Sequence, residues 1–263
     1  MKYGFIGCGN MGSAIAKALS KSTKDILLTD INTDKAASLA QELGCKFADN
    51  EEVVRSCDRI FLAVKPQMLG EVLAPLKKIL PERKPLIISM AAGMTIAKIE
   101  DFCGTTLPVI RIMPNTPVAV SSGMILFCHN AYVNEEMLSD FLSDAAFCGQ
   151  WDQLREELID AAGVVSGCGP AYMYMFMDAL ARGAEQCGVP KDKALIYAAA
   201  TMIGAAKMVQ QSPLSPEQLK NNVCSPGGST IAGVNVLDAG GFTDTLIECV
   251  KAAYKRNQEL GKY

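Results

Sequence analysis

The chain has 263 residues, of which 49% are hydrophobic and 20% are charged, and its formal net charge at pH 7 is −3. This length suits one large domain or two modest ones, and the apolar fraction predicts a buried core rather than a disordered chain. Because charges of both signs are spread along both halves, we expect neither a nucleic acid nor an anionic membrane surface as a partner.

The cysteines and the histidine limit the possible chemistry. The ten cysteines are isolated, without a C-x-x-C pair, and His129, which we place in a loop, is the sole histidine. A zinc site needs clustered thiolates or imidazoles, so we expect no metal. Scattered cysteines are typical of reduced thiols that fill apolar space. With neither a signal peptide nor a membrane-spanning run, the sequence predicts a cytoplasmic protein.

The first half alternates short apolar runs with amphipathic stretches. We predict strands at residues 2–6, 26–30, 60–64, 86–90, 109–112 and 124–128, and helices at 10–20, 33–43, 51–56, 67–79 and 96–102. This alternation is typical of βαβ units with right-handed crossovers. It predicts a doubly wound, mostly parallel α/β sheet with helices on both faces.

Helical patterns replace this alternation near residue 150. Pro170 suits a first helical turn, Gly188 suits a helix end, and Pro190 suits the next helix start. We predict that residues 194–206, which are almost uncharged, form a helix buried on all sides, and that a last helix spans 243–260. We therefore expect a dinucleotide-binding domain at 1–150 and an all-α domain at 151–263 that needs a partner chain.

The segment Gly7-Cys8-Gly9-Asn10-Met11-Gly12 fits G-x-G-x-x-G between a predicted strand and a predicted helix. In such a motif the first glycine allows the turn, the second lets backbone approach a pyrophosphate, and the third packs helix on strand. We predict a Rossmann dinucleotide site here, although the glycines could simply form a strand-to-helix turn. Asp30, at the end of the second strand, could accept hydrogen bonds from ribose hydroxyls and repel a 2′-phosphate. It could also simply cap the next helix.

Three loops follow the next predicted strands, at the sheet edge where ligands bind. They are Val64-Lys65-Pro66, Ala91-Ala92-Gly93 and Met113-Pro114-Asn115-Thr116-Pro117. Each could instead be an ordinary loop without a binding role. Two glycine-rich segments, Ser166-Gly167-Cys168-Gly169-Pro170-Ala171-Tyr172 and Cys224-Ser225-Pro226-Gly227-Gly228-Ser229-Thr230-Ile231, are each predicted to begin a helix. The second presents N–H groups and hydroxyls suited to a small carboxylate, or it is a helix cap.

The sequence lacks an obvious catalytic base, and this absence favours reduction of a C=N bond. Alcohol oxidation needs a base such as histidine or lysine, and the second half has no Lys-x-x-x-Asn pair of the kind found in β-hydroxyacid dehydrogenases. A protonated imine attracts hydride without a strong base. A reductase for another cyclic imine or a β-hydroxy acid, and a nucleotide sensor without turnover, remain alternatives.

These motifs, together with Ala63-Val64-Lys65-Pro66, occur in the order seen in pyrroline-5-carboxylate reductases, and the resemblance covers nearly the whole chain. It implies reduction of L-1-pyrroline-5-carboxylate to L-proline by NADPH or NADH, the last step of proline biosynthesis. It also implies a Rossmann domain followed by an all-α dimerisation domain that interleaves two subunits, often within larger rings. The active site would lie between the cofactor domain of one subunit and the helical domain of the other.

The resemblance also assigns roles to residues. For the cofactor it implies Gly7, Gly9, Asn10, Met11 and Gly12 at the diphosphate and Asn50 at the adenosine, where our own reasoning also places Asp30. It implies that the nicotinamide half is lined by Val64, Lys65, Pro66, Ala91, Ala92 and Gly93, and that Asn222 approaches the cofactor from the helical domain. For the substrate it implies Ser225, Gly228, Ser229, Thr230 and Glu156, with the Thr230 hydroxyl as the catalytic contact to the ring nitrogen. Two departures are Cys168, where the family has serine, and Asp30, where NADPH-preferring members have Ser, Thr or Arg. Cofactor preference therefore stays open, as do oligomer size, feedback by proline and the proton source.

Overall fold

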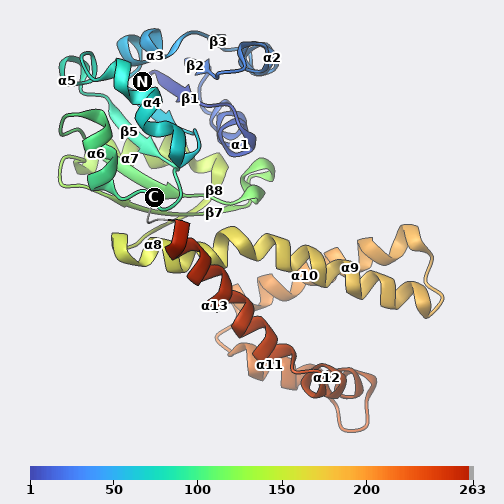
Figure 1. The fold of residues 1–263 in the computed structure, drawn as a ribbon. Coiled ribbons are helices and arrows are strands. Elements are labelled where there is room, and N and C mark those ends of the chain that lie inside the picture. Colours follow the sequence, from blue (N-terminus) through green and yellow to red (C-terminus); the bar gives the residue numbers. More distant parts are fainter. Residues whose placement is uncertain (261–263) are drawn as a thin grey trace. The chain divides into compact units, whose positions relative to one another are not determined.

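The computed structural model describes residues 1–260, which fall into two compact units (Figure 1). One unit contains Met1–Cys168 together with the end of the chain from Ala253, and the other contains Gly169–Ala252. Among the described helices, none has the length and apolar character to cross a membrane. The predicted division at residue 150 stays a prediction.

The first unit is built on one sheet, whose strands in the described chain are ordered β3-β2-β1-β4-β5-β6-β7-β8. Strands β1 to β6 pair in parallel, β7 is antiparallel to β6, and β8 is parallel to β7. The bounds are β1 Tyr3–Ile6, β2 Ile26–Thr29, β3 Lys46–Phe47, β4 Arg59–Leu62, β5 Leu86–Ser89, β6 Val109–Met113, β7 Gly123–His129 and β8 Gly149–Gln153. The predicted doubly wound α/β fold is confirmed.

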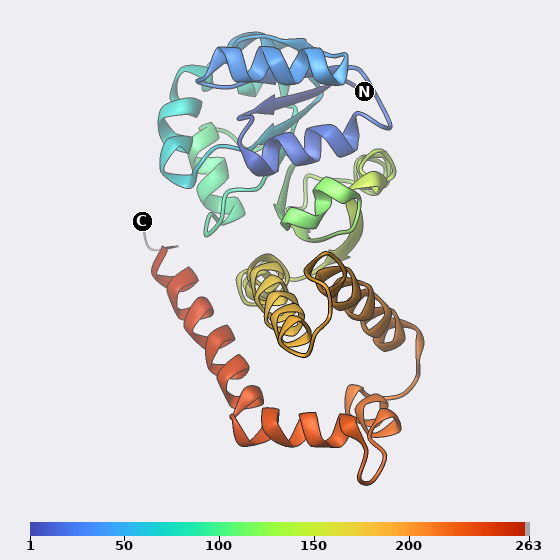
Figure 2. The same ribbon diagram turned by 90° about the vertical axis from the view of Figure 1, so that its right-hand side faces the viewer.

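Alternating side chains of the strands build a core on each face of the sheet. In β1, Phe5 belongs to one core and Ile6 to the other, and Phe61 and Leu62 of β4 divide in the same way. Helices cover both faces (Figure 2). Their bounds are α1 Asn10–Leu19, α2 Thr33–Leu43, α3 Asn50–Ser56, α4 Leu69–Leu73, α5 Leu80–Arg83, α6 Ile96–Cys103, α7 Glu135–Asp144 and α8 Glu156–Gly163, with short 3₁₀ turns η1 Pro66–Met68, η2 Ala74–Leu76, η3 Thr116–Val120 and η4 Ala146–Cys148.

Several local predictions for this unit were wrong. Strands β3 and β8 were missed because β3 has two residues and β8 reads Gly-Gln-Trp-Asp-Gln, without apolar alternation. The helix predicted at 67–79 is divided into η1, α4 and η2, with Pro75 inside η2. His129 is the last residue of β7, where it pairs with Ile110, and does not lie in a loop.

The second unit is helical, with α9 Gly169–Gln186, α10 Lys191–Gln211, α11 Pro216–Val223, α12 Ser229–Ala239 and the first part of α13 Phe242–Leu260. Helices α9 and α10 pack against each other, and α12 stands apart from them (Figures 1 and 2). Within the described chain α10 is mostly exposed, with Ile196 64% and Ile203 58% exposed. The prediction of a helix buried on all sides is therefore wrong for a single chain, because none of residues 1–260 covers these side chains.

The segment Ser166–Tyr172 contains the first residues of α9, as predicted, but the backbone before it is already helical. The helical backbone continues without a break from α8 through η5, a π-helical turn at Val164–Cys168, into α9. Pro170 is the second residue of α9 and lies in its first turn, as predicted. The second glycine-rich segment does precede a helix, since Gly228 is the N-cap of α12.

Candidate active site

The three motif glycines differ in what the fold requires of them. Gly7 has φ +106°, and a Cβ there would lie 2.6 Å from the Ala63 carbonyl oxygen. A Cβ on Gly12 would collide with the Gly7 carbonyl. Gly9 has an ordinary φ of −62°, and a Cβ there would meet nothing within 4 Å. The fold thus explains Gly7 and Gly12, whereas the bare backbone at Gly9 suits the close approach of a diphosphate.

The start of α1 has no side-chain cap. Its N-cap is Gly9, and Ser13 N–H closes the first helical hydrogen bond to Gly9 O at 2.9 Å. The N–H groups of Asn10, Met11 and Gly12 therefore have no acceptor within the helix, at the end where the helix dipole is positive. An anionic group fits this position.

Asp30 connects the end of β2 to the glycine loop. Its Oδ2 accepts a hydrogen bond from Cys8 N–H at 2.6 Å, and its Oδ1 accepts from Asn32 N–H at 2.9 Å. The N-cap of α2 is Asn32 rather than Asp30. The Asp30 carboxylate is thus fixed beside the loop, and each oxygen keeps a lone pair for a ligand hydroxyl.

The neighbouring Cys8 is a packing residue. Its side chain is buried and its Sγ lies 3.6 Å from Thr29 O. Burial, and then the nearby Asp30 charge, raise the pKa of the Cys8 thiol to about 12. Cys8 is therefore protonated at neutral pH and has no nucleophilic role.

A cleft of about 1040 Å³ joins these features. Of the predicted cofactor residues it is lined by Gly7, Gly9, Asp30, Asn50, Val64 and Lys65, whereas Asn10, Met11, Gly12, Pro66, Ala91, Ala92 and Gly93 do not line it. Sequence reasoning missed several lining residues, namely Thr33, Lys35, Phe47, Met68, Glu71, Val72 and Pro75. No sequence motif marks these residues, and Phe47 belongs to the two-residue strand β3, which the sequence analysis missed.

Asn50 lines this cleft, and a hydrogen bond orients its side-chain amide. It begins α3, and its Oδ1 accepts from the Thr29 hydroxyl at 3.0 Å. This bond occupies the amide oxygen and leaves the amide nitrogen to donate toward the cleft. Apolar side chains of Phe47, Met68 and Val72 line the same cleft and suit the flat face of a base.

The predicted substrate residues Ser225, Gly228, Ser229 and Thr230, and the predicted cofactor residue Asn222, belong to the helical unit. Gly227 has φ +70°, and the turn closes with Gly228 N–H donating to Ser225 O at 3.0 Å. The Gly228 N–H is thereby occupied. The N–H groups of Ser229 and Thr230, the first residues of α12, have no side-chain cap and both residues are exposed.

Glu156 already has two partners. Its Oε1 accepts from Ile96 N–H at 2.7 Å at the start of α6, and it lies 3.5 Å from a guanidinium nitrogen of Arg111. Arg111 is buried and also pairs with Asp160. The carboxylate thus anchors α8 to the sheet, and its predicted role at the substrate stays a prediction.

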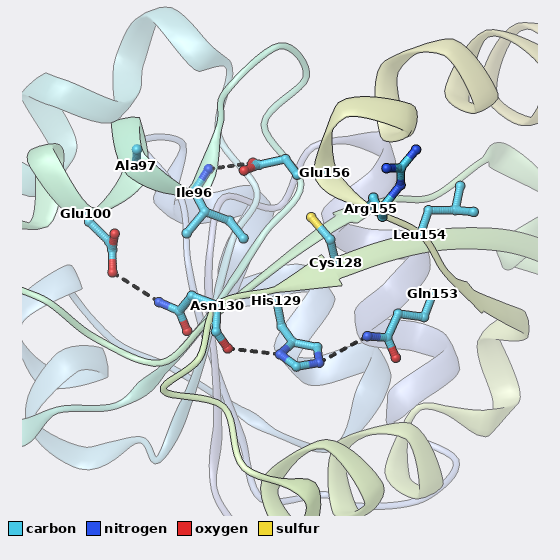
Figure 3. Close-up of a pocket in the computed structure, with 10 residues that line it drawn as sticks. All are labelled: Ile96, Ala97, Glu100, Cys128, His129, Asn130, Gln153, Leu154, Arg155 and Glu156. Atoms are coloured by element: carbon cyan, nitrogen blue, oxygen red, sulfur yellow. Dashed lines mark hydrogen bonds between the residues drawn. The ribbon is translucent and has the colours of Figure 1, made fainter.

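A second cavity, of about 720 Å³, lies beside the ends of β7 and β8 (Figure 3). Its polar groups already have partners: Asn130 donates to Glu100 at 3.0 Å, His129 lies between Asn130 O and the Gln153 amide, and Arg155 pairs with Glu157 at 3.2 Å. With these groups occupied, the cavity offers little to orient a ligand. The glycine-loop cleft is the better candidate.

The sheet order, the uncapped glycine loop and the cleft define a dinucleotide-binding domain of the Rossmann type. Two family models match the chain, pyrroline-5-carboxylate reductase dimerisation at residues 156–260 and NADP oxidoreductase coenzyme F420-dependent at residues 2–93. A pyrroline-5-carboxylate reductase of Escherichia coli is 38% identical over 99% of this chain and 98% of that protein. The chain therefore belongs to the pyrroline-5-carboxylate reductase family.

Solved structures agree with this assignment. The pyrroline carboxylate reductase of Plasmodium falciparum with NADP bound has a TM-score of 0.88 and 32% identity, over 99% of this chain and 98% of that one. The Streptococcus pyogenes 1-pyrroline-5-carboxylate reductase has a TM-score of 0.90 and 31% identity, over 98% of each chain. The predicted family, the Rossmann domain followed by a helical dimerisation domain, and the assignment as a reductase that uses a nicotinamide dinucleotide are confirmed.

Proposed function

We propose that this chain reduces L-1-pyrroline-5-carboxylate to L-proline with NADH or NADPH, the last step of proline biosynthesis. The family membership supports the reaction, and the uncapped start of α12 carries the assignment of the substrate site. There the turn from Ser225 to Gly228 leaves the N–H groups of Ser229 and Thr230 without a capping side chain, at the positive end of an eleven-residue helix.

The chain's own groups bind and orient the imine. The substrate carboxylate accepts hydrogen bonds from the Ser229 and Thr230 N–H groups, within the glycine turn formed by Ser225 and Gly228. The Thr230 hydroxyl bonds the ring nitrogen and fixes the direction of the C=N bond. A bound reduced nicotinamide supplies the hydride to the ring carbon, and the nitrogen keeps the proton of the iminium, so that a neutral ring amine results.

The cleft supports the cofactor assignments of the residues that line it, and the family membership supports the others. The N–H groups of Asn10, Met11 and Gly12 bind the diphosphate beside the bare backbone of Gly9. The Asn50 amide and Asp30 bind the adenosine ribose. We further propose that the nicotinamide half of the cofactor is held by Val64, Lys65 and Pro66 together with Ala91, Ala92 and Gly93. We propose that Asn222 approaches the cofactor from the helical domain.

We propose NADH as the preferred cofactor because of Asp30. Its carboxylate is held in place by two backbone N–H groups and lines the cleft. A fixed carboxylate there accepts hydrogen bonds from the ribose hydroxyls, but its negative charge repels a 2′-phosphate. Lys35 also lines the cleft and offsets part of this repulsion.

We propose that two chains pair through the helical domain, within a larger ring, and that residues 1–150 and 151–263 divide the cofactor and substrate roles. Exposed apolar side chains on α9, α10 and α12, among them Met175, Ile196 and Val236, support pairing. All ten cysteines are free thiols, which supports a cytoplasmic location.

Substitution of Thr230 tests this function. Thr230→Ala should lower kcat with pyrroline-5-carboxylate by about 100-fold, as loss of one hydrogen bond to the reacting group does. Thr230→Ser keeps the hydroxyl and should retain most of kcat. Dinucleotide affinity, measured by fluorescence titration, should be unchanged in both variants. Equal kcat in Thr230→Ala and the wild type would refute the role of the hydroxyl.

A further inference from the structure

The Met113-Pro114-Asn115-Thr116-Pro117 motif has no part in the cleft, because none of its residues lines it. The motif's central side chain, Asn115, is buried, and its amide bridges two backbone segments. Its Oδ1 accepts from Met124 N–H at 2.9 Å, near the start of β7. Its Nδ2 donates to Ser166 O at 2.9 Å, in the π-turn η5.

The Ser166 carbonyl lacks the usual α-helical donor four residues ahead. In an α-helix the carbonyl of residue 166 would accept from the N–H of residue 170. Residue 170 is proline, which has no N–H and whose ring clashes with the carbonyl four residues earlier. The backbone widens to a π-turn over Val164–Cys168, and Asn115 supplies the hydrogen bond that Pro170 cannot give.

A second contact of the motif lies one turn earlier on the same helix. Gly163, the last residue of α8, is buried, and a Cβ there would lie 2.9 Å from Met113 Cγ. The motif therefore holds the helix at Gly163 and at Ser166, on both sides of the point where the π-turn begins.

We propose that Asn115 is a positioning residue for the reduction, and that it acts with Pro170 to hold the π-turn in a single conformation. This role rests on the proposed function, in which the dinucleotide cleft belongs to the sheet unit and Thr230 to the helical unit. The helix α8–η5–α9 carries the chain from one unit to the other at Cys168. If its backbone had several conformations at η5, a smaller fraction of molecules would be competent for hydride transfer.

A double-mutant cycle between Asn115 and Pro170 tests this proposal. Asn115→Ala should lower kcat by about 10-fold, the cost of removing the side-chain donor from the part-buried Ser166 carbonyl, and leave the dinucleotide Kd unchanged. In the Pro170→Ala background the alanine N–H can reach Ser166 O, so adding Asn115→Ala should lower kcat by no more than about threefold.

Asn130→Ala is the matched control. Asn130 also bridges backbone, accepting from Val109 N–H at 3.1 Å and donating to Leu107 O at 2.7 Å, but it does not contact η5. Asn115→Ala and Asn130→Ala should lose similar stability in urea, and only the former should lose kcat. If Asn115→Ala does not fold, Asn115→Ser, whose hydroxyl can reach only one of the two partners, takes its place.

Hydrogen exchange of the η5 amides gives a readout independent of turnover. Exchange there should rise in Asn115→Ala and return toward the wild-type rate in the double variant. A normal kcat in folded Asn115→Ala, or an equal effect of Asn115→Ala with and without Pro170, would overturn the proposal. Absence of turnover in the wild type would refute the proposed function, and this role with it.

Discussion

Replacing Asp30 by serine should move cofactor use toward NADPH. The Asp30 carboxylate is fixed by Cys8 N–H and Asn32 N–H and lines the cleft, so it cannot swing away from a 2′-phosphate. Two unit charges about 5 Å apart at an effective dielectric constant of about 20 interact by about 3 kcal/mol. Solvent and salt screening at this half-exposed site reduce the repulsion to about 2 kcal/mol, or about 30-fold in affinity.

The assay is the ratio of kcat/KM for NADPH to kcat/KM for NADH, measured with pyrroline-5-carboxylate at fixed ionic strength. Asp30→Ser should raise this ratio by about 30-fold, and added salt should shrink the difference. Asp49→Ser is the matched control, because Asp49 also lines the cleft and its carboxylate caps α3 by accepting from Glu52 N–H at 2.7 Å. An equal shift in both variants, or a wild type that prefers NADPH, would refute the reasoning.

Three further predictions concern stability and the glycine loop. Asp144→Ala should cost about 3 kcal/mol in urea unfolding, because Asp144 pairs at 2.9 Å with the buried Arg59, whereas Glu51→Ala in the exposed pair with Arg55 should cost under about 0.5 kcal/mol. The pKa of the buried Cys103 thiol is raised from 9.0 to about 12, chiefly by burial. The neutral thiol therefore stabilises the fold fully below pH 9, and this contribution falls by about 1.4 kcal/mol per pH unit as pH rises from 9 toward 12. The slope of Tm against alkaline pH should be shallower in Cys103→Ala, and an unchanged slope would contradict this. Gly7→Ala should abolish dinucleotide binding in titrations, because a Cβ would lie 2.6 Å from the Ala63 carbonyl oxygen, whereas Gly44→Ala, with a similar positive φ and open space, should leave binding intact.

The parts of the fold that the sequence predicted are those with strong local signals. Strands β1, β2, β4, β5, β6 and β7 were found because apolar runs mark strands buried on both faces. Strand β8 was missed because its binding to β7 depends on backbone pairing and on Trp151, whose Nε1 donates to Ala145 O at 3.2 Å, rather than on an apolar pattern. The antiparallel direction of β7 depends on the short connection through η3, which composition does not indicate.

The candidate site was predictable where one motif forms it. The glycine loop and the start of α12 each depend on a few consecutive residues, so the sequence predicted both helix starts, while the roles of their residues stay predictions. The π-turn was not predictable, since glycine and proline at residues 167–170 also suit a helix start. The link between Asn115 and Ser166 joins residues 51 positions apart, so it could not be seen in local sequence.

The most direct test of the account is product analysis with the purified wild-type chain. Pyrroline-5-carboxylate is supplied with NADH or NADPH, proline is quantified by chromatography, and dinucleotide oxidation is followed by absorbance. The account predicts one proline formed for each dinucleotide oxidised, with higher kcat/KM for NADH. Binding of either dinucleotide without proline formation would contradict it.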